Sequence, residues 1–176
     1  KFRFRPVDEI IREVETCGSR MIAINDADFW GTKEHPMSVM RALKGRGIHW
    51  QAGVTSKLAQ DDSMLELAAE SGCTLLSIGF ESITRSTLTS VHKHVNRPET
   101  FASLVEKVHS YGIMVFGLFM FGFDGDDPSV FETTARFNID ADYDACAYSA
   151  LTPYPGTLTW YEMKKAGRIV SYDWSK

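Results

Sequence analysis

The sequence predicts an α/β fold in which a parallel sheet of about five strands has helices on its outside. Two kinds of residue mark the element boundaries. Four glycines each follow a stretch with helical spacing and precede an apolar, strand-like one: Gly18, Gly47, Gly72 and Gly112. Glycine ends a helix in the left-handed conformation at no steric cost. Four prolines stand where helices would begin, where a missing N–H group costs nothing: Pro6, Pro36, Pro98 and Pro128.

The first half of the chain predicts three helices and two strands in alternation. An apolar stripe with helical spacing is formed by Val7, Ile10, Ile11 and Val14. The run CGSRMIAI then predicts the first strand, and a less regular helix follows from about Pro36 to Arg46. The run RGIHWQAG predicts the second strand, followed by a helix from about Asp62 to Glu70.

The second half continues the same alternation. The run SGCTLLSIGF predicts the third strand, and a second clear helical stripe is formed by Phe101, Leu104, Val105 and Val108. The run YGIMVFGLFMFGF predicts the fourth strand. A last strand near Ala145 to Leu151 and a last helix near Leu158 to Lys165 complete the series. The strands are nearly continuous in apolar residues, which is typical of parallel strands buried on both faces and joined by right-handed connections.

Composition limits the classes of function. The chain has 176 residues, of which 44% are hydrophobic and 12% aromatic, so we expect one folded domain spanning residues 1–176. No apolar run reaches the ~18 residues of a membrane span. The net charge of −4 argues against a dedicated nucleic-acid surface. Three distant cysteines, Cys17, Cys73 and Cys146, fit reduced thiols in a cytoplasmic protein rather than a disulfide framework or a metal knuckle.

The first expected element is a helix, and no strand precedes it for its apolar face to cover. We therefore expect the chain to begin partway through a domain; the alternative is that this helix caps the edge of the sheet. Without a preceding strand, the strand near Met21 to Ile24 would keep unpaired N–H and C=O groups. Such edges pair with other chains, so we expect a homo-oligomer, unless the first helix or the chain end folds over the edge.

Ligands of parallel α/β folds lie at the carboxyl ends of the strands. Carboxylates stand at three of the five expected ends, with Asp26 and Asp28 after the first strand, Glu81 after the third and Asp124 after the fourth. The second end is expected at residues 51–56 and the fifth at residues 151–157. Aspartate at such a place is commonly a helix cap or a turn residue. Glu81 has no capping role there, which favours a ligand contact.

Other motifs carry less information. Gly117, Gly122 and Gly125 lack the G-x-G-x-x-G order and flank a strand rather than open a helix, so they predict no dinucleotide site. They indicate instead a close approach of backbone or ligand. The sequence contains no G-x-S-x-G nucleophile elbow.

The runs at these strand ends resemble the radical S-adenosylmethionine (SAM) superfamily. They are DADFWG, SGCTLLSIGFES, YGIMVFGLFMFGFDGD, and LTPYPGT followed by GRIVSYDW. Within it, they are most similar to the class whose members often carry an N-terminal cobalamin-binding domain. The resemblance covers nearly the whole chain in the family's order, and it implies part of a (β/α)6 barrel, the partial TIM barrel of that family.

The resemblance also implies cofactors. In the family, a [4Fe–4S] cluster is held by a CxxxCxxC motif after the first strand, and its unique iron binds SAM. Reduction cleaves SAM to a 5′-deoxyadenosyl radical, which abstracts hydrogen from the substrate. This sequence contains no CxxxCxxC. The resemblance therefore implies that the chain corresponds to strands two to six, that the cluster ligands lie upstream of Lys1, and that the fragment alone is inactive.

The family's SAM contacts are carried over by position. Asp26, Asp28 and Phe29 match the loop that approaches the SAM amino group, and Glu81 and Ser82 match the motif that contacts the ribose or methionyl portion. The segment from Gly117 to Gly122, which includes Phe119, matches residues that pack against adenine. Leu151 and Pro153 match residues that flank the adenine.

We therefore expect a fragment of an iron–sulfur oxidoreductase or methyltransferase that acts on a small biosynthetic molecule, with cobalamin present in the full-length protein if the class holds. Two alternatives remain open. One is a noncatalytic α/β binding module that has lost its cysteines. The other is a cofactor-independent barrel enzyme that uses Glu81 or Asp26 as a general base.

Overall fold

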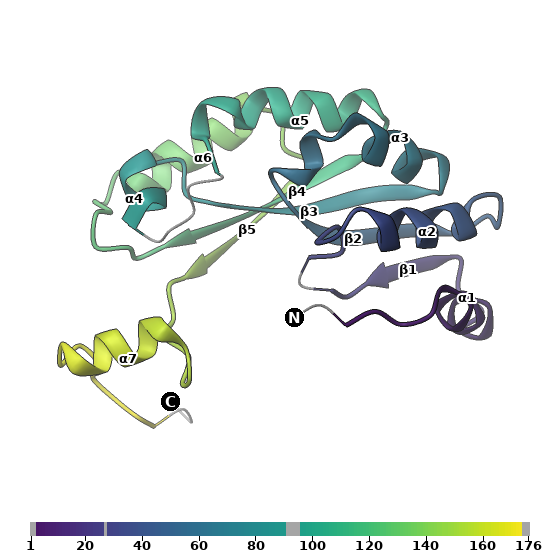
Figure 1. Ribbon diagram of the computed structural model, residues 1–176. Coiled ribbons are helices and arrows are strands. Elements are labelled where there is room, and N and C mark those ends of the chain that lie inside the picture. The colour runs from purple at the N-terminus through teal and green to yellow at the C-terminus, as the bar shows by residue number, and fades with distance from the viewer. Residues whose placement is uncertain (1–2, 27, 91–95, 174–176) are drawn as a thin grey trace.

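The structure is a computed structural model that describes residues 3–26, 28–90 and 96–173 (Figure 1). Five strands form one sheet in the order β1 to β5, and every neighbouring pair is parallel. The strands are β1 (Met21–Ile24), β2 (His49–Thr55), β3 (Cys73–Glu81), β4 (Met114–Phe121) and β5 (Ala145–Ala150). The predicted α/β class and the parallel sheet of about five strands are confirmed. Trp174, the end of the last quoted run, lies outside the described residues.

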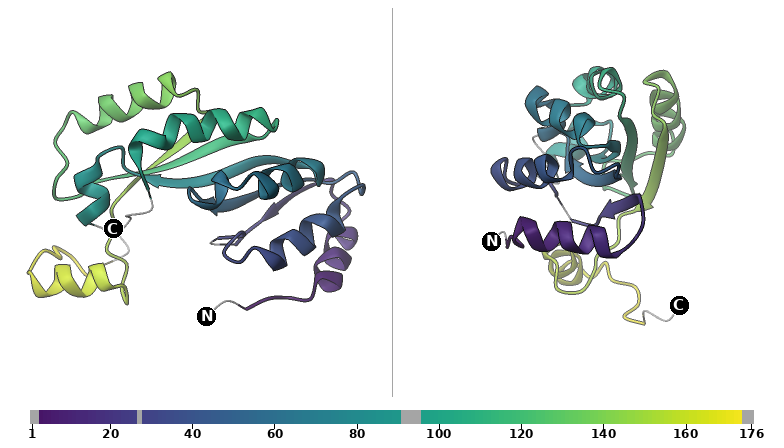
Figure 2. Two further views of the ribbon diagram at one scale, coloured as in Figure 1. Left: turned by 45° about the horizontal axis from the view of Figure 1, so that its top comes forward. Right: turned by 90° about the vertical axis from the view of Figure 1, so that its right-hand side faces the viewer.

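Helices separate the strands. They are α1 (Val7–Thr16), α2 (Glu34–Leu43), α3 (Asp62–Glu70), α4 (Arg85–Ser90), α5 (Phe101–Ser110), α6 (Val130–Asp140) and α7 (Leu158–Lys165), with the short 3₁₀ helices η1 (Leu58–Gln60) and η2 (Pro98–Thr100). Figure 2 shows the sheet curled into a partial barrel, with helices along its outer side and α7 set apart from it. None of the helices in the described ranges is long and apolar enough to span a membrane.

Several predicted boundaries need correction. β2 continues to Thr55, so within the stretch expected to follow this strand only Ser56 lies beyond it. α2 ends at Leu43 rather than near Arg46, because Lys44 has an extended backbone with φ −56° and ψ 131°. Pro128 marks the expected start of a helix, and α6 begins two residues later, at Val130. Its extent was not predicted, because its fully buried residues, Thr134 and Asn138, are polar and leave no apolar stripe in the sequence.

The core lies between the sheet and the outer helices. Alternate strand residues point toward the helices, and the largest of them, Trp50, Phe80 and Phe119, are at most 2% exposed. Phe80 stacks on Phe119 with ring centroids 5.6 Å apart and meets Phe101 of α5 edge-on at 4.7 Å. Burial of side chains of this size, at about 2–3 kcal/mol each, holds the helices on this face of the sheet.

Candidate functional site

The other face of the sheet is concave and carries no helix in the described part of the chain (Figure 2). Its residues alternate with the buried ones. In β2 to β4 they include Gln51, Gly53, Thr55, Leu75, Ser77, Gly79, Phe116, Leu118 and Met120, all partly or well exposed. Among all described strand residues, Glu81 is the one Asp, Glu, Lys or Arg. A single carboxylate therefore stands at the rim of an otherwise uncharged surface.

The carboxylate of Glu81 is folded back onto this concave face. The pairing of β3 with β4 shifts between Gly79 and Glu81, and Glu81 has a φ of 66°. A Cβ atom added at Gly79 would lie 3.1 Å from Oε1 of Glu81. Because Gly79 alternates with the buried Ile78 and Phe80, that contact lies on the concave side. The absence of a side chain at Gly79 is what gives the carboxylate its place.

The loop after β1 crosses the neighbouring strand closely. The backbone N–H of Phe29 donates to the carbonyl of Gly53 at 2.9 Å. A Cβ atom at Gly53 would lie 3.3 Å from the carbonyl oxygen of Asp26, tighter than most real contacts. Glycine in the middle of β2 therefore lets this loop carry Asp26 and Asp28 over the carboxyl half of the sheet.

Asp28 has an unsatisfied oxygen. Its Oδ1 is buried and has no hydrogen-bond partner among the described residues. Burial raises the pKa of this carboxyl above its ordinary value, although the backbone N–H groups of Trp30 and Thr55 oppose the rise and Asp26 nearby adds to it. A buried acceptor without a donor costs free energy. A ligand that brings a donor or a positive charge would recover that cost.

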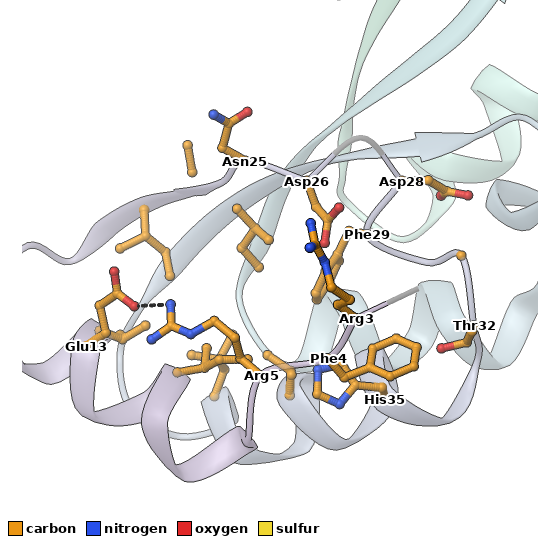
Figure 3. Close-up of a pocket in the computed structure, with 18 of the residues that line it drawn as sticks. Arg3, Phe4, Arg5, Glu13, Asn25, Asp26, Asp28, Phe29, Thr32 and His35 are labelled. Atoms are coloured by element: carbon orange, nitrogen blue, oxygen red, sulfur yellow. Dashed lines mark hydrogen bonds and ion pairs between the residues drawn. The ribbon is translucent and has the colours of Figure 1, made fainter. Parts of the chain in front are cut away.

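Asp28 also lines a cavity of about 780 Å³ beside β1 (Figure 3). Much of its apolar lining comes from α1, β1 and α2 and includes Ile10, Val14, Ile22, Ile24, Val39 and Leu43; Phe29 of the loop after β1 also lines it. Arg3, Asp26 and His35 are polar residues at its margin. Arg3 points toward Asp26, and the ring of His35 lies 4.8 Å from that of Phe4. Glu81 and Leu151 do not line it. The carboxylates after β1 therefore stand between this cavity and the carboxyl edge of the sheet.

Phe29 and Ser82 are less accessible than the resemblance implies. Phe29 is 8% exposed and packs edge-on against Trp50, with ring centroids 5.6 Å apart. Ser82 is 4% exposed, and its hydroxyl accepts the backbone N–H of Thr84 at 3.0 Å. Both side chains therefore stabilise the loops that carry Asp28 and Glu81.

Gly117 and Phe119 lie in the helix-covered core, which corrects the expectation that they contact a ligand. A Cβ atom at Gly117 would come within 2.8 Å of the Tyr143 ring. Phe119 is 2% exposed and is stacked between Phe80 and Tyr148. The concave side of β4 is instead formed by Leu118 and its alternate neighbours. The β4 run is apolar at nearly every position, so the sequence could not show which residues face which side.

The ends of β4 and β5 meet beside the concave face. Gly122 has a φ of 95°, and its missing Cβ atom would lie 3.9 Å from Cβ of Leu151. The N–H of Leu151 donates to the carbonyl of Phe121 at 2.7 Å. Leu151 and Pro153 are both half-buried. These two side chains and Gly122 form the part of the rim opposite the β1 loop.

The cysteines do not form a cluster site. Cys17 is exposed on the end of α1, Cys73 is buried and Cys146 is half-buried, and all three are free. Burial raises the pKa of Cys73 to about 12 and also raises that of Cys146. In the described part of the chain, no group of three His, Cys, Asp or Glu residues could hold a metal ion. An iron–sulfur cluster requires converging thiolates, so the described residues do not fit one.

Asn96 is a site feature that the sequence did not reveal. Its side chain is 6% exposed and donates to the carbonyls of Gly79 and Phe80 at the end of β3. The contacts join residues 16 and 17 positions apart, and no local motif marks them. Only the fold brings this amide to the strand end that carries Glu81.

Comparison with known protein families and structures gives consistent likenesses. Residues 1–137 match the model of the radical SAM superfamily. The chain is 32% identical to bacteriochlorophyllide d C-12(1)-methyltransferase of Chlorobaculum tepidum, over 99% of this chain and 39% of the relative. It is 25% identical to the hopanoid C-2 methylase of Rhodopseudomonas palustris, over 97% of this chain and 34% of the relative. The chain thus spans about two fifths or less of the curated relatives named here.

A solved structure shares the fold. The radical SAM methyltransferase TsrM of Kitasatospora setae, with cobalamin and a [4Fe–4S] cluster bound, aligns with a TM-score of 0.77 at 18% identity. The alignment covers 92% of this chain and 32% of that structure. At this identity the likeness concerns the fold, and it agrees with the curled parallel sheet described above.

Proposed function

This chain belongs to the radical SAM superfamily, and on that premise we propose that the protein containing it is a radical SAM methyltransferase. The observation that carries the proposal is the pair of carboxylates, Asp28 with an unpartnered buried oxygen and Glu81 folded over Gly79, at one edge of an uncharged concave sheet. Several relatives named as methyltransferases or methylases favour methyl transfer over the broader class of oxidoreductases.

The carboxylates at this edge support SAM, which carries a positive charge, as its ligand. The unpartnered Oδ1 of Asp28, together with Asp26, would receive the SAM ammonium group, because a cation recovers the cost of burying that carboxylate. Glu81 would accept hydrogen bonds from the ribose hydroxyls or the methionyl portion. Gly122, Leu151 and Pro153 would flank the adenine. When bound, SAM supplies a methyl group and, after one-electron reduction, a carbon-centred radical.

The cluster ligands are proposed to lie in another part of the protein. The described residues do not fit a [4Fe–4S] cluster. We propose that cysteines outside this chain hold it, on a strand that pairs with β1. Among the described strands, β1 pairs only with β2, and Met21 is 75% exposed. In a polypeptide limited to these residues, we propose that a second copy pairs there. Cobalamin is proposed from the likeness to TsrM alone.

The concave face indicates the kind of substrate. Its strand residues offer methyl, methylene and thioether groups together with small residues such as Gly53 and Ser77, and apart from Glu81 no Asp, Glu, Lys or Arg stands in the described strands. With Glu81 assigned to SAM, a charged substrate would find no other counter-ion in these strands and would lose hydration. We therefore propose a bulky, mainly apolar small molecule whose reacting carbon lies near the Glu81 rim.

The test uses the full-length protein, reconstituted anaerobically with iron, sulfide and cobalamin. With a reductant and SAM labelled in its methyl group, the proposal predicts SAM turnover and label transfer to an apolar acceptor in a panel of tetrapyrroles and polycyclic lipids. Binding of SAM without turnover would favour the noncatalytic module. Turnover of an acceptor without SAM would favour the cofactor-independent enzyme, for which Glu81 or Asp26 would be the base.

A further inference from the structure

We propose that Asn96 is a positioning residue, which sets the Glu81 carboxylate on the concave face by clamping the distorted end of β3. The inference rests on the proposed SAM site and adds to it a residue that touches neither SAM nor the reacting atoms. Asn96 precedes η2 and reaches the sheet from a separate loop. Its effect on SAM binding would act entirely through the backbone of residues 79–81.

The geometry at the end of β3 is unusual. In a regular strand, consecutive carbonyls point to opposite sides and serve two different neighbouring strands. Here Nδ2 of Asn96 donates to both the Gly79 carbonyl at 3.0 Å and the Phe80 carbonyl at 2.9 Å. Two consecutive carbonyls therefore converge on one amide nitrogen. This convergence coincides with the shift in strand pairing between Gly79 and Glu81.

The same distortion determines where Glu81 lies. Glu81 adopts a φ of 66°, a left-handed conformation that is uncommon for glutamate. Such a conformation persists only where surrounding contacts hold it. With it, the carboxylate returns over Gly79, where Oε1 lies 3.1 Å from the position of an added Cβ atom. The two bonds from Asn96 hold the carbonyls immediately before this residue.

The chemistry of asparagine suits this place. Its amide offers two N–H donors and one carbonyl acceptor in a single rigid plane. Both donors are used on β3, and the acceptor Oδ1 receives the hydroxyl of Ser56 at 2.6 Å. Ser56 is 2% exposed and directly follows β2. Asn96 therefore also joins the carboxyl ends of β2 and β3 inside a buried, satisfied network.

The test measures SAM affinity of the full-length reconstituted protein by equilibrium dialysis, with thermal unfolding measured in parallel. We expect Asn96→Ala to weaken SAM binding by roughly ten- to a hundredfold, the size of one lost charge-assisted hydrogen bond. The matched control is Asn138→Ala. Asn138 is also buried, at 4% exposed, and donates to Tyr148 on the helix-covered face. Its loss should lower thermal stability without changing SAM affinity.

A double variant separates positioning from general loosening. If Asn96 acts through Glu81, Asn96→Ala in a Glu81→Gln background should weaken binding by no more than about twofold beyond Glu81→Gln alone, because coupled residues are not additive. Asn96→Ser keeps a hydroxyl in the buried network but is too short to donate to both β3 carbonyls. It should weaken SAM binding as Asn96→Ala does, and it provides the readout if Asn96→Ala does not fold.

The outcomes are distinct. Wild-type affinity in a folded Asn96 variant, or losses that multiply in the double variant, would overturn the role of Asn96 and leave the SAM site intact. A wild-type protein that binds no SAM would overturn the proposed function, and the role of Asn96 with it.

Discussion

On its helix-covered face the sheet presents Trp50, Phe80 and Phe119, each at most 2% exposed, whereas on its concave face the same strands carry half-buried Ser77, Gly79 and Leu118. The covered face is filled by large rings that interlock with the helices. The concave face is lined by small or flexible side chains that leave room. The contrast shows that packing accounts for the first set of residues, whereas the second set forms the surface on which we propose that SAM and the substrate bind.

The largest expected effect concerns the cysteines, none of which lies on the concave face. Cys146 alternates with the concave residues of β5 and pairs with Gly117 on the helix side, and Cys73 is 5% exposed in the core. A polypeptide of residues 1–176, incubated anaerobically with iron and sulfide, should therefore show no thiolate-to-iron absorption near ~400 nm. Retention of a stoichiometric cluster, measured as iron and sulfide per chain, would contradict the assignment of its ligands to another part of the protein.

Adjacent residues of β4 should differ sharply in their contribution to stability. Phe119→Ala removes a fully buried ring stacked on Phe80 and should lower the free energy of unfolding by about 3–5 kcal/mol. Leu118→Ala, on the half-buried concave side, should cost about 1 kcal/mol. Urea denaturation of the two variants measures the difference. Equal losses would mean that the faces of β4 are not as distinct as described.

Substituting alanine for one glycine on each face compares the two faces by adding a single methyl group. Gly117→Ala places Cβ within 2.8 Å of the Tyr143 ring and should destabilise by about 1–3 kcal/mol. Gly79→Ala meets only the end of the Glu81 side chain, at 3.1 Å. It should cost under ~1 kcal/mol in stability and mainly weaken SAM binding. Denaturation and dialysis on both variants provide the two readouts, and a large stability loss in Gly79→Ala would remove the contrast.

Asp61 and Asp28 should respond to pH in opposite directions. Asp61 caps α3 and pairs with Lys33, and these hydrogen bonds lower its pKa to about 2. Its stabilisation is therefore present above its ordinary pKa and is lost as pH falls toward 2. Burial raises the pKa of Asp28, so stability is highest below its ordinary pKa and declines as pH rises through the folded-state value.

Asparagine substitutions separate the two cases. Asp61→Asn keeps a capping acceptor, so at neutral pH it should lower the free energy of unfolding by no more than ~1 kcal/mol. Because the group that titrates is removed, the free energy of unfolding should also fall less steeply as the pH is lowered. Asp28→Asn should be neutral or slightly stabilising while weakening SAM binding. Stability measured from pH 2 to 8 tests both, and a strongly destabilised Asp28→Asn would show that Asp28 is a structural residue.

The fold and the positions of the strand ends could be predicted from the sequence, but the orientations and contacts of the side chains at those ends could not. Glycine spacing located the ends of α1, α3 and α5 but not that of α2, which ends at Leu43, and Gly72 adopts a backbone with a positive φ of 96°. The side to which Phe119 points could not be predicted, because an unbroken apolar run has no alternation. Nor could Asn96 be found, since its partner Ser56 is 40 positions away. The orientation of Glu81 depends on a pairing shift that only neighbouring strands create.

Glu81 is the central SAM-binding group of the proposed site. The decisive measurement is the SAM dissociation constant of the full-length reconstituted protein for the wild type, Glu81→Gln and Glu132→Gln, the last being an exposed α6 carboxylate paired with Arg136. We predict that Glu81→Gln weakens binding roughly tenfold or more, while Glu132→Gln matches the wild type. Unchanged affinity in Glu81→Gln would contradict the placement of SAM at the concave rim.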